Sequence, residues 1–475
     1  MKKVGLLLIG LLAIGLYANN QVVAQEENDQ VVEVVDVEES DGEASAEMSE
    51  DLKHRSLTKT ADTRTVSFQK FHIEVTDGAA NSVSVPISNS KFTISYVYNN
   101  RELLLYEGMT NEQGQILNLP PKEIPFEVTA LRIRFTLGND SRGYVQKYNK
   151  VAYRFIFNCG LNAANTTNTI NYLNRKVRFG NTADEDTYFY NFQASRINHY
   201  FDQAVQEYSH AVGLANDLLP DTEPFEVAPI NINFEKGMLL KSNGFNKNGY
   251  DGKGTADIVM KDKADKNFPT QYLMHNVMHE WTHWNLYRYA YAPSGGYDGH
   301  YSYNLNPKVS FKEGWCLFVG DLFALNYDIA KEDLHVQTDN YNGINRLLGK
   351  STNYTAKQVL YDLVDTGSND EDFSISQRYL DGEMSDLEVR RINLGILHTV
   401  MAESKTFTLQ ELLSAVEKKY VLTKSDKEKF AKLLEINGLS REGAFTLDND
   451  GNPLTSPLQA VEPLANIEED WDEME

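Results

Sequence analysis

Three residues between positions 279 and 283 have the types and the spacing that metal-assisted hydrolysis requires. His279 and His283 are four residues apart, and Glu280 directly follows the first histidine. On a helix, positions four apart lie on the same face, so both imidazoles can bind one metal ion. Bound Zn²⁺ lowers the pKa of its water towards ~7, and Glu280 could take the proton of that water. This HExxH pattern predicts a zinc site with Glu280 as the catalytic general base.

The residues around the motif predict a buried helix that begins near Thr270. Its apolar positions lie almost all round the helix, and they are Leu273, Met274, Val277, Met278, Trp281 and Leu286. His275 lies one turn before His279 on the same face, and we interpret it as a packing histidine, with a role in orienting a ligand as the alternative. A long helix is expected over 184–214, and a short strand at 256–260 is expected to line the cleft beside the motif helix.

Two histidines leave a catalytic zinc one protein ligand short, and Glu313 is the expected third ligand. It lies in SFKEGWCLFVGDLFALN, residues 310–326, whose apolar stripe predicts a helix with Glu313 in its first turn. The alternative role of Glu313 is to close a capping box with Ser310. Asp298 and His300 are the rival third ligands.

An HExxH helix followed by a loop and by a glutamate in an EGW context resembles the gluzincin metallopeptidases, of which thermolysin and the zinc aminopeptidases are familiar members. The resemblance covers about residues 184–326. It implies an α+β zincin catalytic domain that hydrolyses a peptide or protein substrate. It also implies that His279, His283 and Glu313 hold Zn²⁺, with Glu280 acting on its water.

The resemblance is to the gluzincin class and not to the thermolysin family itself. The gap from His283 to Glu313 is longer than in thermolysin, and Leu317 stands where thermolysin has an aspartate that supports the site. Metzincins are excluded because Leu286 and Tyr289 occupy the positions of their glycine and third histidine.

Gluzincins usually have a tyrosine or histidine that donates a hydrogen bond to the developing oxyanion. The loop after the motif helix offers several candidates, between which the sequence does not choose: Tyr291, Tyr297, His300, Tyr301 and Tyr303. Asp321 is interpreted as a solvated helix residue, with support of a zinc histidine as its alternative role.

The chain as a whole predicts a multidomain fold: an all-β sandwich, the α+β zincin domain and a helical C-terminal lobe. The expected segments are a signal peptide (1–24), an acidic disordered linker or pro-segment (25–62), the antiparallel β-sandwich (63–160), the catalytic domain (161–328), the helical lobe (329–445) and an acidic tail (446–475). The stretches SVSVPISNSKFTISY and TNEQGQILNLP resemble transthyretin-like or carboxypeptidase-regulatory-like domains, which implies a binding or spacing module; a passive stalk is the alternative.

Charge and cysteine content limit the possible partners. The net charge of −23 argues against nucleic acid and anionic membranes, and no long apolar run follows the signal peptide, so membrane insertion is not expected. A secreted or periplasmic location is expected. Cys159 and Cys316 are interpreted as small buried residues, with a disulfide as the alternative. The main rival function is a catalytically silent zincin-like binding or cell-envelope protein, and the oligomeric state is left open.

Overall fold

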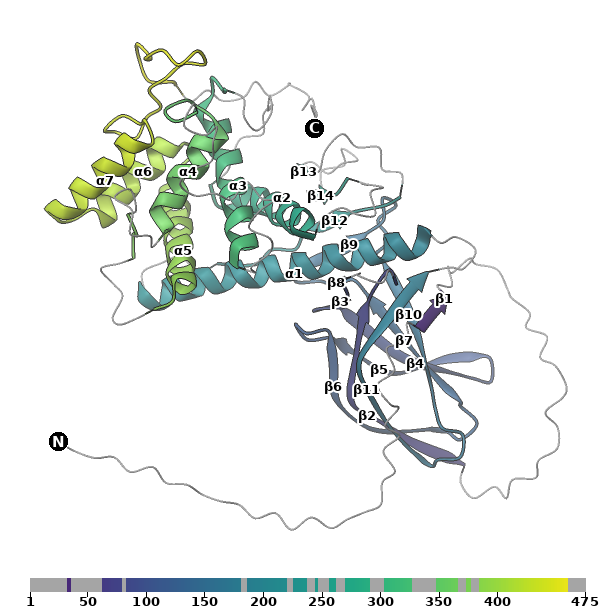
Figure 1. Cartoon of the computed structure of the whole chain (residues 1–475). Helices are drawn as coiled ribbons and strands as arrows, with labels where there is room; N and C mark the ends of the chain where they lie inside the picture. The colour runs from purple at the N-terminus through teal and green to yellow at the C-terminus, as the bar shows by residue number, and fades with distance from the viewer. Residues whose placement is uncertain are drawn as a thin grey trace, which may run out of the picture.

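The structure is a computed structural model of the chain, and the residues that it describes form three β-sheets and seven α-helices. These residues are 32–35, 62–78, 83–180, 186–219, 225–236, 244–246, 256–261, 270–290, 303–326, 347–365, 373–376 and 384–459. The arrangement is a mixed α/β one in several parts, with two of the sheets at one end and most helices at the other (Figure 1). None of the described helices combines the length and the hydrophobicity that a membrane crossing needs. The predicted signal peptide lies outside the described residues.

Two sheets pack face to face in the N-terminal part of the chain. The first has the order β1 (Val32–Val35), β11 (Thr167–Gly180), β2 (Thr63–Val75), β3 (Val85–Pro86), and β6 (Gln115–Pro125) also pairs with β2. The second has the order β10 (Arg154–Gly160), β7 (Ala130–Thr136), β4 (Lys91–Tyr98), β5 (Arg101–Met109). Aromatic side chains fill the space between them: the Phe71 ring lies 6.2 Å from Phe135 and 5.4 Å from Phe157, and Phe155 stacks on Phe179 at 4.7 Å.

This sandwich differs from the predicted one in two respects. It continues to Gly180 and does not end at 160, and it is not purely antiparallel, because β11 pairs with β2 and with β1 in parallel. Parallel strands must be joined by a long crossover connection and not by a tight hairpin turn. The sequence therefore contains no local turn signal from which this pairing could be predicted. In addition, Val32–Val35 forms β1 inside the segment predicted to be a disordered linker. Its run of valines favours a strand, although the acidic residues around it argued for disorder.

A third sheet joins the sandwich to the helical part of the chain. Its order is β13 (Gly244–Asn246), β14 (Asp257–Val259), β12 (Asn231–Asn233), β9 (Gly143–Gln146), β8 (Gly138–Asn139). Strand β9 is parallel to β12, whereas β13 is antiparallel to β14. The predicted boundary at 160 therefore does not separate two independent units, because a β-hairpin that precedes it completes a sheet with strands that follow it.

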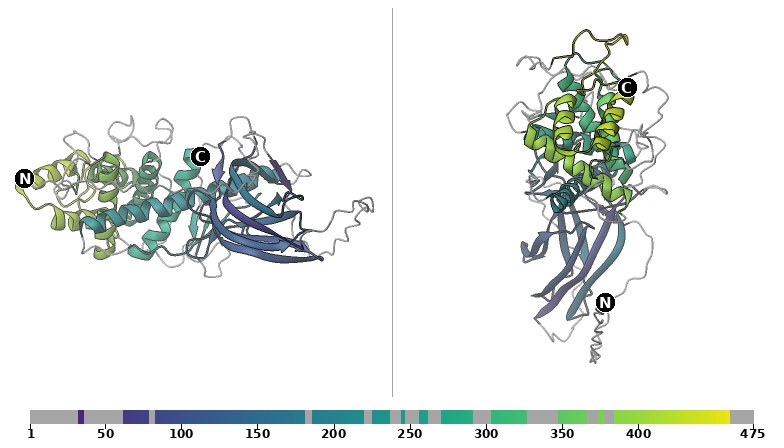
Figure 2. Two further views of the ribbon diagram at one scale, coloured as in Figure 1. Left: turned by 90° about the horizontal axis from the view of Figure 1, so that it is seen from below. Right: turned by 90° about the vertical axis from the view of Figure 1, so that its left-hand side faces the viewer.

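Helix α1 (Asp186–Leu218) connects the two ends of the molecule. It packs against β11 near its start and against α2 (Thr270–Ala290) and α5 (Asp386–Ser404) further along. Seen from below, it extends from the sandwich to the C-terminal helices (Figure 2). The helix was predicted at 184–214 from its apolar stripe, and the structure confirms it with an end four residues later. Gly395 of α5 allows close packing on α1, because a Cβ there would lie 2.3 Å from the carbonyl oxygen of Ala211.

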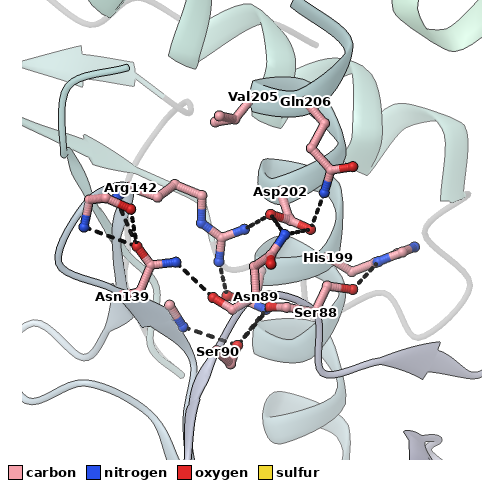
Figure 3. A network of polar contacts seen from close by, with 12 residues as sticks. Ser88, Asn89, Ser90, Asn139, Arg142, His199, Asp202, Val205 and Gln206 are labelled. Carbon is pink, nitrogen blue, oxygen red and sulfur yellow. Dashed lines mark hydrogen bonds and ion pairs between the residues drawn. The ribbon is translucent and has the colours of Figure 1, made fainter. Parts of the chain in front are cut away.

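A buried polar network fixes α1 to the sandwich (Figure 3). Arg142, which precedes β9, forms an ion pair of 2.6 Å with Asp202 of α1, and each side chain is only 4% exposed. The Asn89 side-chain amide donates to both Asp202 carboxylate oxygens, at 2.8 and 3.0 Å. Arg142 also donates to Asn198 at 2.8 Å, and Asn198 donates to the Ser88 carbonyl at 3.2 Å. Since every charge in the network has a partner of opposite charge or a hydrogen bond, the network holds α1 in one register on the sheets.

The C-terminal part of the chain is helical, as predicted. Helix α3 (Pro307–Asn326) is followed by α4 (Asn353–Val364), α5, α6 (Leu409–Tyr420) and α7 (Lys424–Ile436). Helices α5, α6 and α7 each begin with a capping box, at Ser385, Thr408 and Thr423. Their apolar sides join the same hydrophobic core as α1 and the sheets.

Candidate metal centre

Helix α2 presents the HExxH motif from a buried position. On the opposite side of α2, the Trp281 ring packs edge to face against the Tyr208 ring of α1, with the ring centroids 5.5 Å apart. His279 and Glu280 are 7% and 6% exposed, and the His283 side chain is 11% exposed. The predicted buried helix beginning at Thr270 is confirmed, and it directs both histidines to one side.

Helix α3 brings Glu313 to the two histidines, but from a different place in the helix than predicted. The helix begins at Pro307, and the Asn306 side chain accepts a hydrogen bond from the backbone N–H of Lys308. Glu313 therefore lies in the second turn and not in the first. Ser310 is inside the helix, where its hydroxyl pairs with that of Ser351 at 3.0 Å. The capping box considered for Ser310 and Glu313 is thus absent.

The ligand atoms of His279, His283 and Glu313 converge on one point. The two imidazole Nε2 atoms are 3.1 Å apart, and the Glu313 Oε2 atom lies 3.5 Å from Nε2 of His279 and 3.2 Å from Nε2 of His283. A tetrahedral zinc ion about 2.0–2.1 Å from each ligand requires neighbouring ligand atoms to be ~3.3–3.5 Å apart. Among the described residues, this is the group of three ligand side chains with the spacing of a metal site.

The protonation states of His279 and Glu313 favour the binding of a metal cation. Burial lowers the pKa of His279 to about 3, so its imidazole is neutral at pH 7. Burial by itself would raise the pKa of Glu313, but His283 and Lys312 lower it, and the net pKa lies well below the usual value. A neutral imidazole and an ionised carboxylate are the forms that bind a metal ion.

Glu280 has the properties of a proton acceptor beside this point. Burial, with a smaller contribution from the charge of Glu313, raises the pKa of Glu280 to about 7, whereas His283 and a backbone hydrogen bond from Phe245 oppose the shift. A carboxyl group with a pKa near the working pH can both take up and release a proton.

Strand β13, which contains Phe245, is the end strand of the third sheet among the described residues, and it contacts α2. The Phe245 ring lies 5.9 Å from both Trp284 and Tyr287 of α2. The strand predicted at 256–260 does exist as β14, but it is flanked by β13 and β12 and does not form the edge. The edge strand β13 lies in a Gly/Asn-rich stretch and has only three residues, so no strand was predicted there.

Two further residues of α3, which were not predicted to belong to the site, contact the ligands. The Lys312 ammonium lies 3.3 Å from Oε1 of Glu313, the oxygen that does not face the histidines. The Cys316 sulfur lies 3.1 Å from Nδ1 of His283. Helical spacing could have indicated Cys316, because it is three residues after Glu313 and so shares its face.

His275 and Asp321 form a separate buried group with Lys357 of α4. Asp321 lies 3.1 Å from Nε2 of His275 and 2.8 Å from Nζ of Lys357. His275 is therefore a packing histidine with a charged partner, as interpreted, and its ring stacks on His279 with centroids 5.8 Å apart. The interpretation of Asp321 as a solvated residue was wrong, since it is 4% exposed, and its histidine partner is not one of the three ligands.

The remaining candidates are only partly placed. Asp298, Tyr291, Tyr297, His300 and Tyr301 lie outside the described residues. Tyr303 is described, and burial followed by the charge of Asp448 raises its pKa. Cys159 and Cys316 are both free and buried, so the disulfide considered for them is absent.

The chain was also compared with known proteins. No protein-family model, curated protein or solved structure matches it.

Proposed function

We propose that the protein is an exported zinc-dependent metallopeptidase of the gluzincin type. The observation that carries the proposal is the convergence of three ligand atoms, 3.1 to 3.5 Å apart, from a motif helix and the helix that follows it. His279, His283 and Glu313 would hold the zinc ion. When bound, zinc would supply a water of lowered pKa and polarise a peptide carbonyl.

Glu280 would move the proton in this reaction. Its carboxylate would accept a proton from the attacking water and then deliver that proton to the nitrogen of the leaving amine. The pKa of about 7 supports both steps, because neither protonation state is strongly favoured at neutral pH.

The end strand β13 supports a peptide as substrate. The backbone N–H of Phe245 hydrogen-bonds to Glu280, so this strand runs beside the carboxylate that would act on the scissile bond. An extended peptide can pair with such a strand edge through its main chain, largely independently of sequence. We therefore assign to β13 the role expected earlier for residues 256–260.

The test combines metal analysis with hydrolysis of a peptide library. The purified protein should hold about one zinc per chain. Glu280→Gln should keep the metal and lose activity by roughly 10²- to 10⁴-fold. Glu411→Gln is the matched control: Glu411 is exposed on α6, and glutamine also serves in a capping box.

Two results would contradict parts of the proposal. Full activity of Glu280→Gln would exclude the proposed mechanism. Bound zinc without hydrolysis of any library peptide would favour the rival function, a silent binding or cell-envelope protein. Export is tested separately: the mature protein recovered outside the cytoplasm should begin near Gln25, because the pattern of residues 1–24 is that of a signal peptide.

A further inference from the structure

The Cys316 thiol is in direct contact with a ligand of the proposed metal centre. Its sulfur lies 3.1 Å from Nδ1 of His283, whereas Nε2 of the same ring faces Glu313 at 3.2 Å. The two ring nitrogens point in different directions, so Cys316 lies behind the imidazole and is not itself a metal ligand. The thiol is fully buried, at 0% exposure.

A histidine ligand is usually held by a carboxylate or a backbone carbonyl, both of which only accept hydrogen bonds. A thiol differs because it can donate through S–H and accept at sulfur. It can therefore pair with either neutral tautomer of His283.

We propose that Cys316 is a positioning residue that holds His283 in both its metal-free and its metal-bound tautomer. Without metal, the Nε2–H of His283 donates to the ionised Glu313, and Nδ1 accepts from the thiol. With metal, Nε2 offers its lone pair, the proton is carried on Nδ1, and Nδ1–H donates to the sulfur. Metal binding displaces one proton from Nε2 to solvent, and Nδ1 takes up one proton from solvent. The imidazole and the thiol each carry the same number of protons before and after, and the ring does not turn. This inference rests on the metal centre of the proposed function and not on peptide hydrolysis.

The first test measures zinc affinity by competition with a chelator. Cys316→Ala should bind zinc about 10-fold or more weakly, because loss of such a partner typically costs 10- to 100-fold. Cys316→Ser keeps a donor and an acceptor and should recover part of this loss. Cys159→Ala is the matched control, since Cys159 is the other buried thiol and lies in β10, away from the motif; its affinity should equal that of the unaltered protein.

The second test does not depend on the stability of a Cys316 variant. In Cys159→Ala, Cys316 is the remaining thiol of the chain, which has two cysteines. Its infrared S–H stretching band should shift when zinc is added, because S–H stops donating to Nδ1.

The outcomes separate the two proposals. Absence of zinc binding by the unaltered protein would contradict the metal centre itself. Normal zinc binding together with an unchanged S–H band, or with equal affinity of Cys316→Ala, would overturn the role of Cys316 and leave the metal centre intact.

Discussion

The Arg142–Asp202 pair should be the most sensitive point of the contact between the sandwich and α1. Replacing Arg142 by methionine leaves the Asp202 carboxylate buried with only neutral donors, Asn89 at 2.8 Å and Gln206 at 2.7 Å. It also removes the donor to Asn198. Breaking a buried ion pair from one side typically costs ~3–5 kcal/mol, so we expect the free energy of unfolding to fall by about that amount.

The tryptophans make this prediction a test of coupling between the two ends of the molecule. The chain has four tryptophans, and Trp281, Trp284 and Trp315 lie on α2 and α3, whereas the sandwich has none. Urea unfolding followed by tryptophan fluorescence therefore reports on the helices of the metal centre, although Arg142 lies beside the sandwich. We expect the fluorescence midpoint and the far-UV circular dichroism midpoint to shift together in Arg142→Met.

A double variant separates the effect of charge from the effect of packing. In Arg142→Met with Asp202→Leu neither charge remains, so the double variant should be more stable than Arg142→Met alone. Lys91→Met is the control, because its ion pair with Asp140 is exposed to solvent and should contribute little to stability. A loss below about 1 kcal/mol in Arg142→Met, or a fluorescence midpoint that does not move, would refute the reasoning.

Two further predictions concern helices around the metal centre. Burial lowers the pKa of His398 to about 3. Below pH ~6.5 the unfolded chain therefore binds a proton at this histidine that the folded chain does not bind. As the pH falls from there towards 3, His398 should reduce the free energy of unfolding by about 1.4 kcal/mol per pH unit. His398→Gln should lack that part of the slope in urea titrations at several pH values, and an unchanged slope would contradict the assignment. A Cβ at Gly314 would lie 2.5 Å from Cβ of Ala356 and 2.7 Å from the Asn353 carbonyl, so Gly314→Ala should destabilise the protein by ~1–3 kcal/mol in thermal unfolding, despite the higher helix propensity of alanine. A Gly314→Ala variant as stable as the parent would show that α3 and α4 can separate at no cost.

The sequence predicted those parts of the fold in which periodicity is long and local. The helical lobe expected over 329–445 contains α5 and α6, in each of which an apolar side and a capping residue define the buried face and the start of the helix. The start of α3 was missed by one turn, since Asn306 and Pro307 begin it before the apolar stripe does.

What could not be predicted depends on contacts between distant segments. The parallel pairing of β2 with β11 joins residues about 100 positions apart, and the strands of the third sheet have only two to four residues each. Strands this short have too few residues to show an alternation of apolar and polar side chains. In the candidate site, the spacing of His279 and His283 predicted two metal ligands, and the residue type of Glu313 predicted a third. The contacts of Lys312 with Glu313 and of Cys316 with His283 could not be predicted, because they depend on how α3 faces α2.

The position of β9 has a consequence for the order in which the chain is synthesised. Its partner β12 lies about 85 residues further along, so the β8–β9 hairpin emerges from a ribosome well before the strand that completes its sheet. During that interval the outer edge of β9 is exposed to other chains. Arg142, located at this hairpin, likewise has no counter-charge until α1 has been made. Slow elongation between residues 146 and 231 would thus favour aggregation of the nascent chain, whereas rapid completion of α1 and β12 would protect it.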